Sequence, residues 1–77
     1  MTINALYITQ LDGCVDKDGV KYSVTRLAER CNITRQQAHK ILKGEACPRV
    51  DTAILMSRFI TELFGFEVTP EDLWLVG

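Results

Sequence analysis

The stretch Ser23–Gly44, SVTRLAERCNITRQQAHKILKG, decides the fold, because its spacing of small, apolar and polar residues predicts two short helices joined by a tight turn. Its first residue is a serine, a type that caps helix N-termini, and we expect the first helix to run to about Cys31. Asn32 tolerates the left-handed backbone conformation that a sharp turn requires. Thr34 and Gln37 then have the spacing of a capping box at the start of the second helix.

The second helix of this stretch, residues 35–43, separates into two faces at about 100° per residue. Its predicted buried side consists of Ala38, Ile41 and Leu42. Its outer side consists of Gln36, His39, Lys40 and Lys43, with Arg35 and Gln37 on the flanks of the first turn. This outer surface has no carboxylate, whereas a merely solvated helix more often mixes both charge signs. Arg and Lys side chains suit guanine edges and Gln suits adenine, so the pattern favours a helix that contacts DNA bases.

Basic charge is concentrated around this stretch, although the whole chain has a net charge of −1. Residues 23–49 hold six Lys and Arg against two Asp and Glu, which gives +4. Residues 1–22 give −1 and residues 50–77 give −4. Positive charge confined to one part of a chain is the pattern expected of a protein whose one face meets a polyanion.

Residues 27–48, LAERCNITRQQAHKILKGEACP, resemble the helix-turn-helix of the lambda repressor and Cro group, the XRE-like family. Thr34 matches the hydroxyl cap of that motif, and its packing and loop positions are matched by Leu27, Ala28, Ile33, Ala38, Ile41, Gly44 and Pro48. The resemblance implies an all-α fold, a compact bundle of about five helices. It also implies that the second helix of the motif lies in the major groove of double-stranded DNA while the first crosses the backbone.

Carried over position by position, the resemblance implies base contacts from Arg35, Gln36 and Lys40. Gln37 also matches a base-contacting position, but its place in the capping box explains it equally well. Contacts with the DNA phosphates are implied for Thr34, Lys43 and Arg49, while His39 either contacts a phosphate or is solvated.

The residues before the motif predict a first helix and then a turn. Thr2 is the expected cap of this helix. Its mostly apolar face has helical spacing and consists of Ile3, Leu6, Tyr7, Gln10, Leu11 and Cys14. Asp-Lys-Asp-Gly at 16–19 is a turn signal, so residues 15–22 form either a small hairpin or an ordered loop. Lys17 and Lys21 in this loop either contact phosphates or, as is more common, are solvated.

The residues after the motif predict two further helices and an association surface. The first runs from about Val50 to Phe64 and is ended by Gly65, and it is more apolar than a single core contact needs. The second starts with Thr69 as cap and Pro70 at its first position. We expect residues 59–77 to form a homodimer region, with an interface of Phe59, Leu63, Phe64, Phe66, Leu73 and Trp74. The alternative for Trp74 is that it folds back into the core of its own chain.

Other classes of protein find little support in the sequence. At 77 residues the chain is expected to be one domain, 1–77, with the motif at 23–44. Cys14, Cys31 and Cys47 fit neither a zinc-binding pair nor an even-numbered disulfide framework, and His39 is the single histidine. We therefore expect no enzyme, no cofactor, no metal site and no small-molecule ligand. No stretch approaches the ~18 apolar residues of a membrane span, and no signal peptide is evident, which predicts a cytoplasmic protein associated with the nucleoid.

Together these features predict a sequence-specific DNA-binding regulator of transcription. The small size suggests a Cro-like repressor of phage-like type that binds a pseudo-palindromic operator as a homodimer. The alternative is a helix-turn-helix protein-interaction module, an antitoxin or antirepressor that acts through a protein partner, which the apolar C-terminal third would suit.

Overall fold

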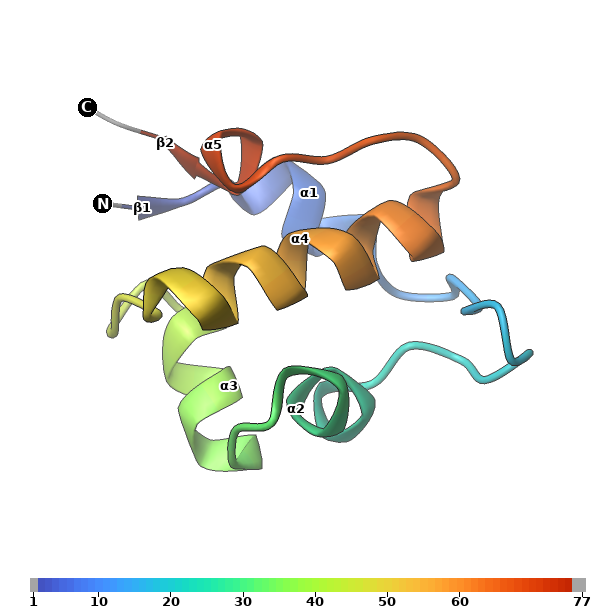
Figure 1. Cartoon of the computed structure of the whole chain (residues 1–77), viewed down its shortest axis with the longest axis horizontal. Helices are drawn as coiled ribbons and strands as arrows, with labels where there is room; N and C mark the ends of the chain where they lie inside the picture. Colours follow the sequence, from blue (N-terminus) through green and yellow to red (C-terminus); the bar gives the residue numbers. More distant parts are fainter. Residues whose placement is uncertain (1, 76–77) are drawn as a thin grey trace.

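A computed structural model describes residues 2–75, which form five helices and a two-stranded antiparallel sheet (Figure 1). In chain order the elements are β1 (Thr2–Ile3), α1 (Ala5–Thr9), α2 (Val24–Cys31), α3 (Arg35–Leu42), α4 (Val50–Phe64), α5 (Pro70–Leu73) and β2 (Trp74–Leu75). Helix α4 lies in the middle, with α2 and α3 on one side and α1, α5 and the sheet on the other. The predicted bundle of about five helices with a helix-turn-helix is confirmed. Residues 76 and 77 of the predicted dimerisation region lie outside the described residues.

The helix-turn-helix forms as its local sequence predicts. The Ser23 hydroxyl accepts a hydrogen bond of 3.1 Å from the backbone N–H of Arg26, which caps α2. Asn32 ends α2 in the left-handed conformation, with φ of 56° and ψ of 40°. The backbone then turns so that the N–H of Ile33 donates to the carbonyl of Ala28. After three connecting residues, α3 begins in a different direction.

The first helix begins later than the sequence predicts. Its N-cap is Asn4, whose side-chain oxygen accepts from the backbone N–H of Leu6 at 3.1 Å, and not Thr2. The physical reason is long-range pairing: Ile3 pairs with Trp74 in the β1–β2 sheet, and the N–H of Asn4 donates to the carbonyl of Leu73. The backbone before Asn4 is therefore extended, and Leu6, expected on an apolar helix face, is exposed.

The segment between α1 and α2 is an ordered loop with a single antiparallel bridge, between Val15 and Lys21. The N–H of Asp16 donates to the carbonyl of Val20 at 3.0 Å, and Gly19 completes the turn with a φ of 79°, which favours glycine. This loop is the ordered alternative of the two that the sequence left open, with one hairpin-like contact.

The last two helices also start and stop where their signals lie. Helix α4 ends at Gly65, whose φ is 79°, and α5 begins with a capping box between Thr69 and Asp72 around Pro70. Helix α5 is only one turn long, because Trp74 leaves it in an extended conformation to pair with β1. A short sheet therefore joins the two ends of the described chain.

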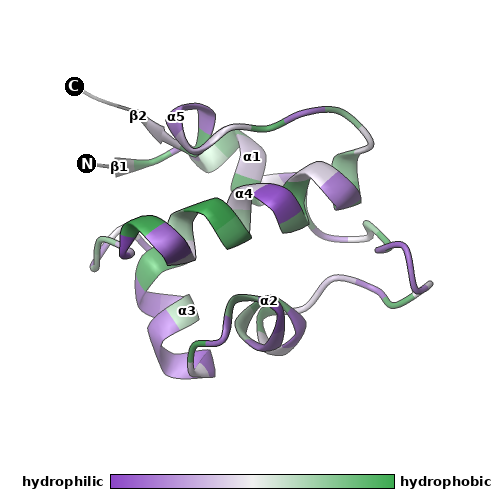
Figure 2. Cartoon of the chain, viewed as in Figure 1, coloured by the Kyte–Doolittle hydropathy of each residue, from purple (hydrophilic) through white to green (hydrophobic). Residues whose placement is uncertain are grey.

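A single apolar cluster fills the space around α4. Figure 2 shows hydrophobic residues along the first half of α4, whereas α3 is mostly hydrophilic. The fully buried members of this apolar cluster include Phe59, Leu11, Leu27, Met56, Ile60, Leu73 and Cys31. Residues from each helix thus belong to this cluster or pack against it, and the outer face of α3 lies outside it. Within residues 2–75, no helix is long and apolar enough to cross a membrane.

Most of the predicted interface residues are buried within this chain. Phe59, Leu63, Leu73 and Trp74 are between 0% and 8% exposed, so their side chains contact their own core and not a partner surface. Trp74 follows the alternative in which it folds back, because β2 pairing places it in the core beside the start of α4. Of the remaining residues in that set, Phe64 is half-buried and stacks between Tyr7 and Phe66, which is 55% exposed.

The burial of Trp74 predicts a large loss of stability when it is truncated. Trp74→Ala is expected to lower the free energy of unfolding by about 3–5 kcal/mol, because it removes a buried indole and leaves a cavity. Urea unfolding followed by circular dichroism measures this. Phe66→Ala is the control and should cost about 1 kcal/mol or less. A loss no larger than that of Phe66→Ala would contradict the burial of Trp74 in the core of its own chain.

Candidate nucleic-acid interface

Helix α3 presents a polar and basic surface to solvent. Its buried residues are Ala38 and Ile41, which pack under α2 and α4. Of the residues predicted to contact DNA, His39 is half-buried and the rest are exposed: Thr34, Arg35, Gln36, Gln37, Lys40, Lys43 and Arg49. The structure therefore brings these side chains to one surface, around α3 and the loop that follows it.

Gln37 is held by the capping box. Its side-chain oxygen accepts from the backbone N–H of Thr34 at 3.0 Å and from the Thr34 hydroxyl at 3.3 Å. In return, the Thr34 hydroxyl oxygen accepts from the N–H of Gln37 at 3.1 Å. The capping role, one of the two explanations that the sequence left open for Gln37, is thus present in the fold, and the Gln37 amide oxygen is already engaged.

A hollow of about 300 Å³ lies between α3 and the start of α4. Three of the predicted contact residues, Gln37, Lys40 and Arg49, line it together with Cys47 and Pro48 of the connecting loop. Arg49 is highly exposed and lies 3.7 Å from the carboxylate of Asp51. The hollow places two cations on either side of a concave surface, an arrangement that suits an anionic backbone.

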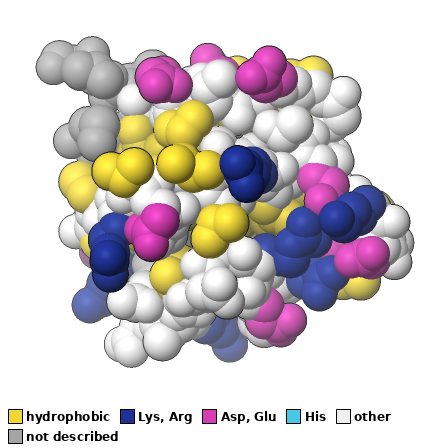
Figure 3. All heavy atoms as spheres, in the orientation of Figure 1, with side chains coloured by type: hydrophobic (Ala, Val, Ile, Leu, Met, Phe, Trp, Pro, Cys, Tyr) yellow, Lys and Arg dark blue, Asp and Glu magenta, His cyan; other side chains and the backbone are white. Residues whose placement is uncertain are grey.

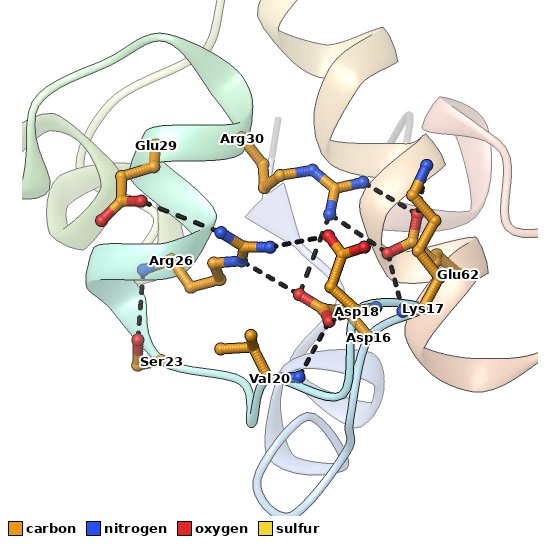
Figure 4. A network of polar contacts seen from close by, with 9 residues as sticks. All are labelled: Asp16, Lys17, Asp18, Val20, Ser23, Arg26, Glu29, Arg30 and Glu62. Atoms are coloured by element: carbon orange, nitrogen blue, oxygen red, sulfur yellow. Dashed lines mark hydrogen bonds and ion pairs between the residues drawn. The ribbon is translucent and has the colours of Figure 1, made fainter.

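The two arginines of α2 do not belong to this surface, although the sequence counted them in its basic patch. Arg26 donates from Nε to Asp16 at 3.0 Å and from Nη2 to Asp18 at 3.1 Å. Arg30 makes a two-bond contact with Glu62 of α4, at 2.8 and 3.1 Å, and lies 3.8 Å from Asp16. Figure 4 shows the resulting network, which connects α2 to α4 and to the loop between α1 and α2, here called the 12–22 loop.

Asp16 is the centre of this network. Its side chain is fully buried, and one oxygen accepts from the backbone N–H groups of Asp18 and Val20 at 2.9 and 3.0 Å. The other oxygen faces both arginines. Lys17, which the sequence left between a phosphate contact and a solvated turn, donates its backbone N–H to Glu62 and places its Nζ 3.9 Å from the same carboxylate.

The network shifts the pKa values of both carboxylates downward. Burial alone would raise the pKa of Asp16, but hydrogen bonds from the Val20 N–H and the Arg26 guanidinium outweigh it, so the pKa lies below its ordinary value of 3.8. Hydrogen bonds from Arg30 hold the pKa of Glu62 below its ordinary value of 4.5. Both groups are therefore charged at neutral pH, and the ion pairs are complete.

The cysteines are separate thiols. Cys14, Cys31 and Cys47 are all free, and burial raises the pKa of Cys31 to about 11. Cys31 therefore packs in the core as a small neutral side chain. Within the described residues, no group of three or more His, Cys, Asp or Glu side chains is placed to hold a metal ion.

The sequence profile of a helix-turn-helix family matches residues 19–61, which is more than half of the chain. The chain belongs to this family. Its members resemble the lambda Cro and XRE proteins, as residues 27–48 suggested, and the match supports a DNA-binding helix-turn-helix regulator. No significant match was found among curated proteins or among solved structures.

Sequence reasoning missed the ion network of this helix-turn-helix protein. Asp16 was interpreted only as part of a turn, and Glu62 only as part of the acidic C-terminal charge. A signal was available, because Asp-Lys-Asp-Gly precedes two arginines four residues apart, Arg26 and Arg30, which lie on one side of a helix. What the sequence could not supply was the contact with Glu62, which lies 32 residues beyond Arg30.

The left-handed turn predicts a specific response at Asn32. Asn32→Ala is expected to lower the free energy of unfolding by about 1 kcal/mol, because a Cβ-bearing residue without asparagine's tolerance is strained at this φ. Asn32→Gly should leave stability unchanged or raise it. Urea unfolding of the two variants compares them directly. Equal losses for alanine and glycine would contradict a backbone origin of the effect.

The network predicts a pH-dependent role for Glu62. Since its folded pKa is lowered, its stabilisation is present above pH 4.5 and is lost as the pH falls through the folded value. Glu62→Gln should therefore lower the free energy of unfolding by about 1–2 kcal/mol at pH 7, and the gap to the unaltered chain should shrink below pH 4.5. Urea titrations at several pH values test this, with the exposed Glu67→Gln as control. A gap that persists unchanged at pH 3 would refute the ion-pair account.

Proposed function

We propose that this chain is a sequence-specific repressor of the Cro-like type, which binds a pseudo-palindromic operator as a homodimer. In this proposal it is a cytoplasmic protein associated with the nucleoid. Membership in the helix-turn-helix family supports the general role, a DNA-binding regulator. The observation that carries the proposal of sequence-specific operator binding is the surface of α3, where exposed Arg, Gln and Lys side chains lie without a carboxylate on the helix.

In this proposal α3 enters the major groove and three side chains contact base edges. Arg35 and Lys40 are suited to guanine and Gln36 to adenine. Gln37 contributes at most its amide N–H₂ group, because its oxygen is engaged with Thr34. The two remaining polar surfaces, the hollow beside Arg49 and the end of α3 at Lys43, lie where the phosphates of the flanking backbone would pass.

The partition of charge supports this docking. Arg26 and Arg30 are neutralised by Asp16, Asp18 and Glu62, so the other cations of residues 23–49 lie on α3 and the loop after it. The acidic residues of α5, Glu71 and Asp72, lie across α4 from α3 (Figure 1). A duplex approaching α3 therefore meets positive charge while the acidic end of the molecule faces away.

A second candidate function is a protein-interaction module such as an antitoxin or antirepressor. It is favoured by the exposed pair Leu6 and Phe66, at 71% and 55% exposure, which line a hollow at the α1 side of the molecule together with Tyr7. Such a protein would copurify with a partner and would show no preference among DNA sequences.

The DNA-binding surface predicts two distinct classes of variant. On a duplex selected by the unaltered chain, Gln36→Ala or Lys40→Ala should lose about 1–3 kcal/mol of binding free energy, and the loss should shrink on unrelated duplexes. Lys43→Ala should weaken all duplexes alike and reduce the salt dependence by about one phosphate contact. Fluorescence anisotropy across a salt series measures both.

Lys21→Ala supplies the control, because this exposed lysine lies in the 12–22 loop away from α3. It should bind every duplex as the unaltered chain does. Equal losses for Lys40→Ala and Lys43→Ala on selected and unrelated duplexes would contradict base contact by α3 and leave only charge attraction.

A further inference from the structure

Four residues of α4 remain exposed in the folded chain, and they lie in one row along the helix. They are Val50, Asp51, Ile54 and Arg58, and the other residues of α4 are buried or half-buried. Spacings of three, four and seven residues place side chains on the same side of a helix. This row, the α4 stripe, exposes 78% of Val50 and 38% of Ile54. It is thus an apolar surface with one acid and one base.

A groove runs beside the α4 stripe. It consists of two hollows of about 390 and 360 Å³ that share Ile54 and Pro70. Its far wall is α5 with the segment before it, which Thr61 fixes to α4 by accepting from the Val68 N–H at 2.8 Å and donating to the Val68 carbonyl at 3.1 Å. On the face seen in Figure 3, hydrophobic side chains gather between α5 and the first half of α4, with isolated acidic and basic side chains beside them.

We propose that the α4 stripe and this groove form the contact between two copies of the chain, with the two α4 helices antiparallel and a two-fold axis passing beside Ile54. The surface is suited to self-association because it carries both a ridge and a hollow. In a two-fold contact each copy's Val50 and Ile54 can enter the groove of the other. The inference rests on the proposed function, because the direction of the axis follows from α3 as the DNA-binding face.

The charges on the stripe are complementary in this arrangement. Asp51 and Arg58 are seven residues apart, so they lie on the same side of α4, at nearly equal distances before and after Ile54. When two such helices run antiparallel about a point midway between these residues, Asp51 of each copy faces Arg58 of the other. Two reciprocal ion pairs would then flank the apolar contact. Within residues 2–75, Arg58 has no ion-pair partner of its own.

The direction of α3 selects the antiparallel arrangement. Helix α3 lies to one side of α4 (Figure 1). A two-fold axis perpendicular to α4 keeps both α3 helices on the same side of the dimer, where one duplex can meet them, whereas an axis parallel to α4 would place them on opposite sides. A contact through Leu6 and Phe66 fails for the same reason, because α1 lies across α4 from α3.

Charge reversal tests the contact directly. In Arg58→Asp, each Asp51 would face an aspartate, and in Asp51→Arg each Arg58 would face an arginine, so each variant alone should dissociate about tenfold or more readily than the unaltered chain. An equimolar mixture of the two variants restores both ion pairs in the heterodimer. Sedimentation velocity without DNA should therefore show weak association for each variant and recovered association for the mixture.

Two control variants and a fold measurement make the result decisive. Asp12→Arg and Lys21→Asp reverse exposed charges of the same signs outside the stripe and should leave association unchanged. Circular dichroism should show that Asp51→Arg still forms helix, since Asp51 lies in the first turn of α4. An unaltered chain that stays monomeric, a mixture that associates no better than its components, or single variants that associate normally would each overturn the proposal.

The same material separates this inference from the proposed function. A dimer that recovers in the mixture but selects no DNA sequence would sink the operator-binding function and leave the contact standing. A chain that selects a DNA sequence while the charge-reversed variants associate normally would sink only the α4 contact.

Discussion

The burial of α4 between the helix-turn-helix and the two chain ends is the constraint on which the rest of the structure depends. Met56, Phe59 and Ile60 have at most 1% of their surface exposed. Removing side chains of this size from water contributes about 1.5–3 kcal/mol each, so α4 supplies a large part of what holds so small a chain together. Helices α2 and α3 pack on one side of it and the two chain ends on another, which leaves α3 with its polar face outward.

Electrostatics divides the molecule in a way that the net charge hides. Two of the basic residues near the motif, Arg26 and Arg30, serve the fold, because they hold α2 to the 12–22 loop and to α4 through Asp16 and Glu62. Arg30 also lies 4.9 Å from the ring centre of Phe59, so the ion pair and the core meet at one point. The acidic residues thus neutralise Arg26 and Arg30, and a chain of net charge −1 still presents a basic face on α3.

The parts of the fold that depend on neighbouring residues were predictable from the sequence. The cap at Ser23, the turn at Asn32, the capping box at Thr34 and the stop at Gly65 each result from chemistry within about four residues. The errors concern contacts between distant residues. Pairing of Ile3 with Trp74 replaced the predicted Thr2 cap, and no local pattern indicates which of two apolar segments will meet.

For the candidate site, the same distinction holds. Exposure of Gln36 and Lys40 follows from helical periodicity. The pairing of Arg26 with Asp16 could be predicted only with the position of Asp16 known. Four of the six residues predicted for the interface are buried in their own chain for a related reason. An apolar residue near the chain end, such as Leu73, can be covered by its own chain or by another, and only the packing decides.

One recognition helix contacts a short piece of DNA, so the account requires two copies on one duplex. Selection of bound duplexes from a random pool by the purified chain tests this most directly. Operator binding by a homodimer predicts an enriched sequence with two-fold symmetry, whose half-sites lie about 10 base pairs apart, one turn of DNA. A pool without any enriched sequence at moderate salt, or one enriched for a single unpaired half-site, would contradict it.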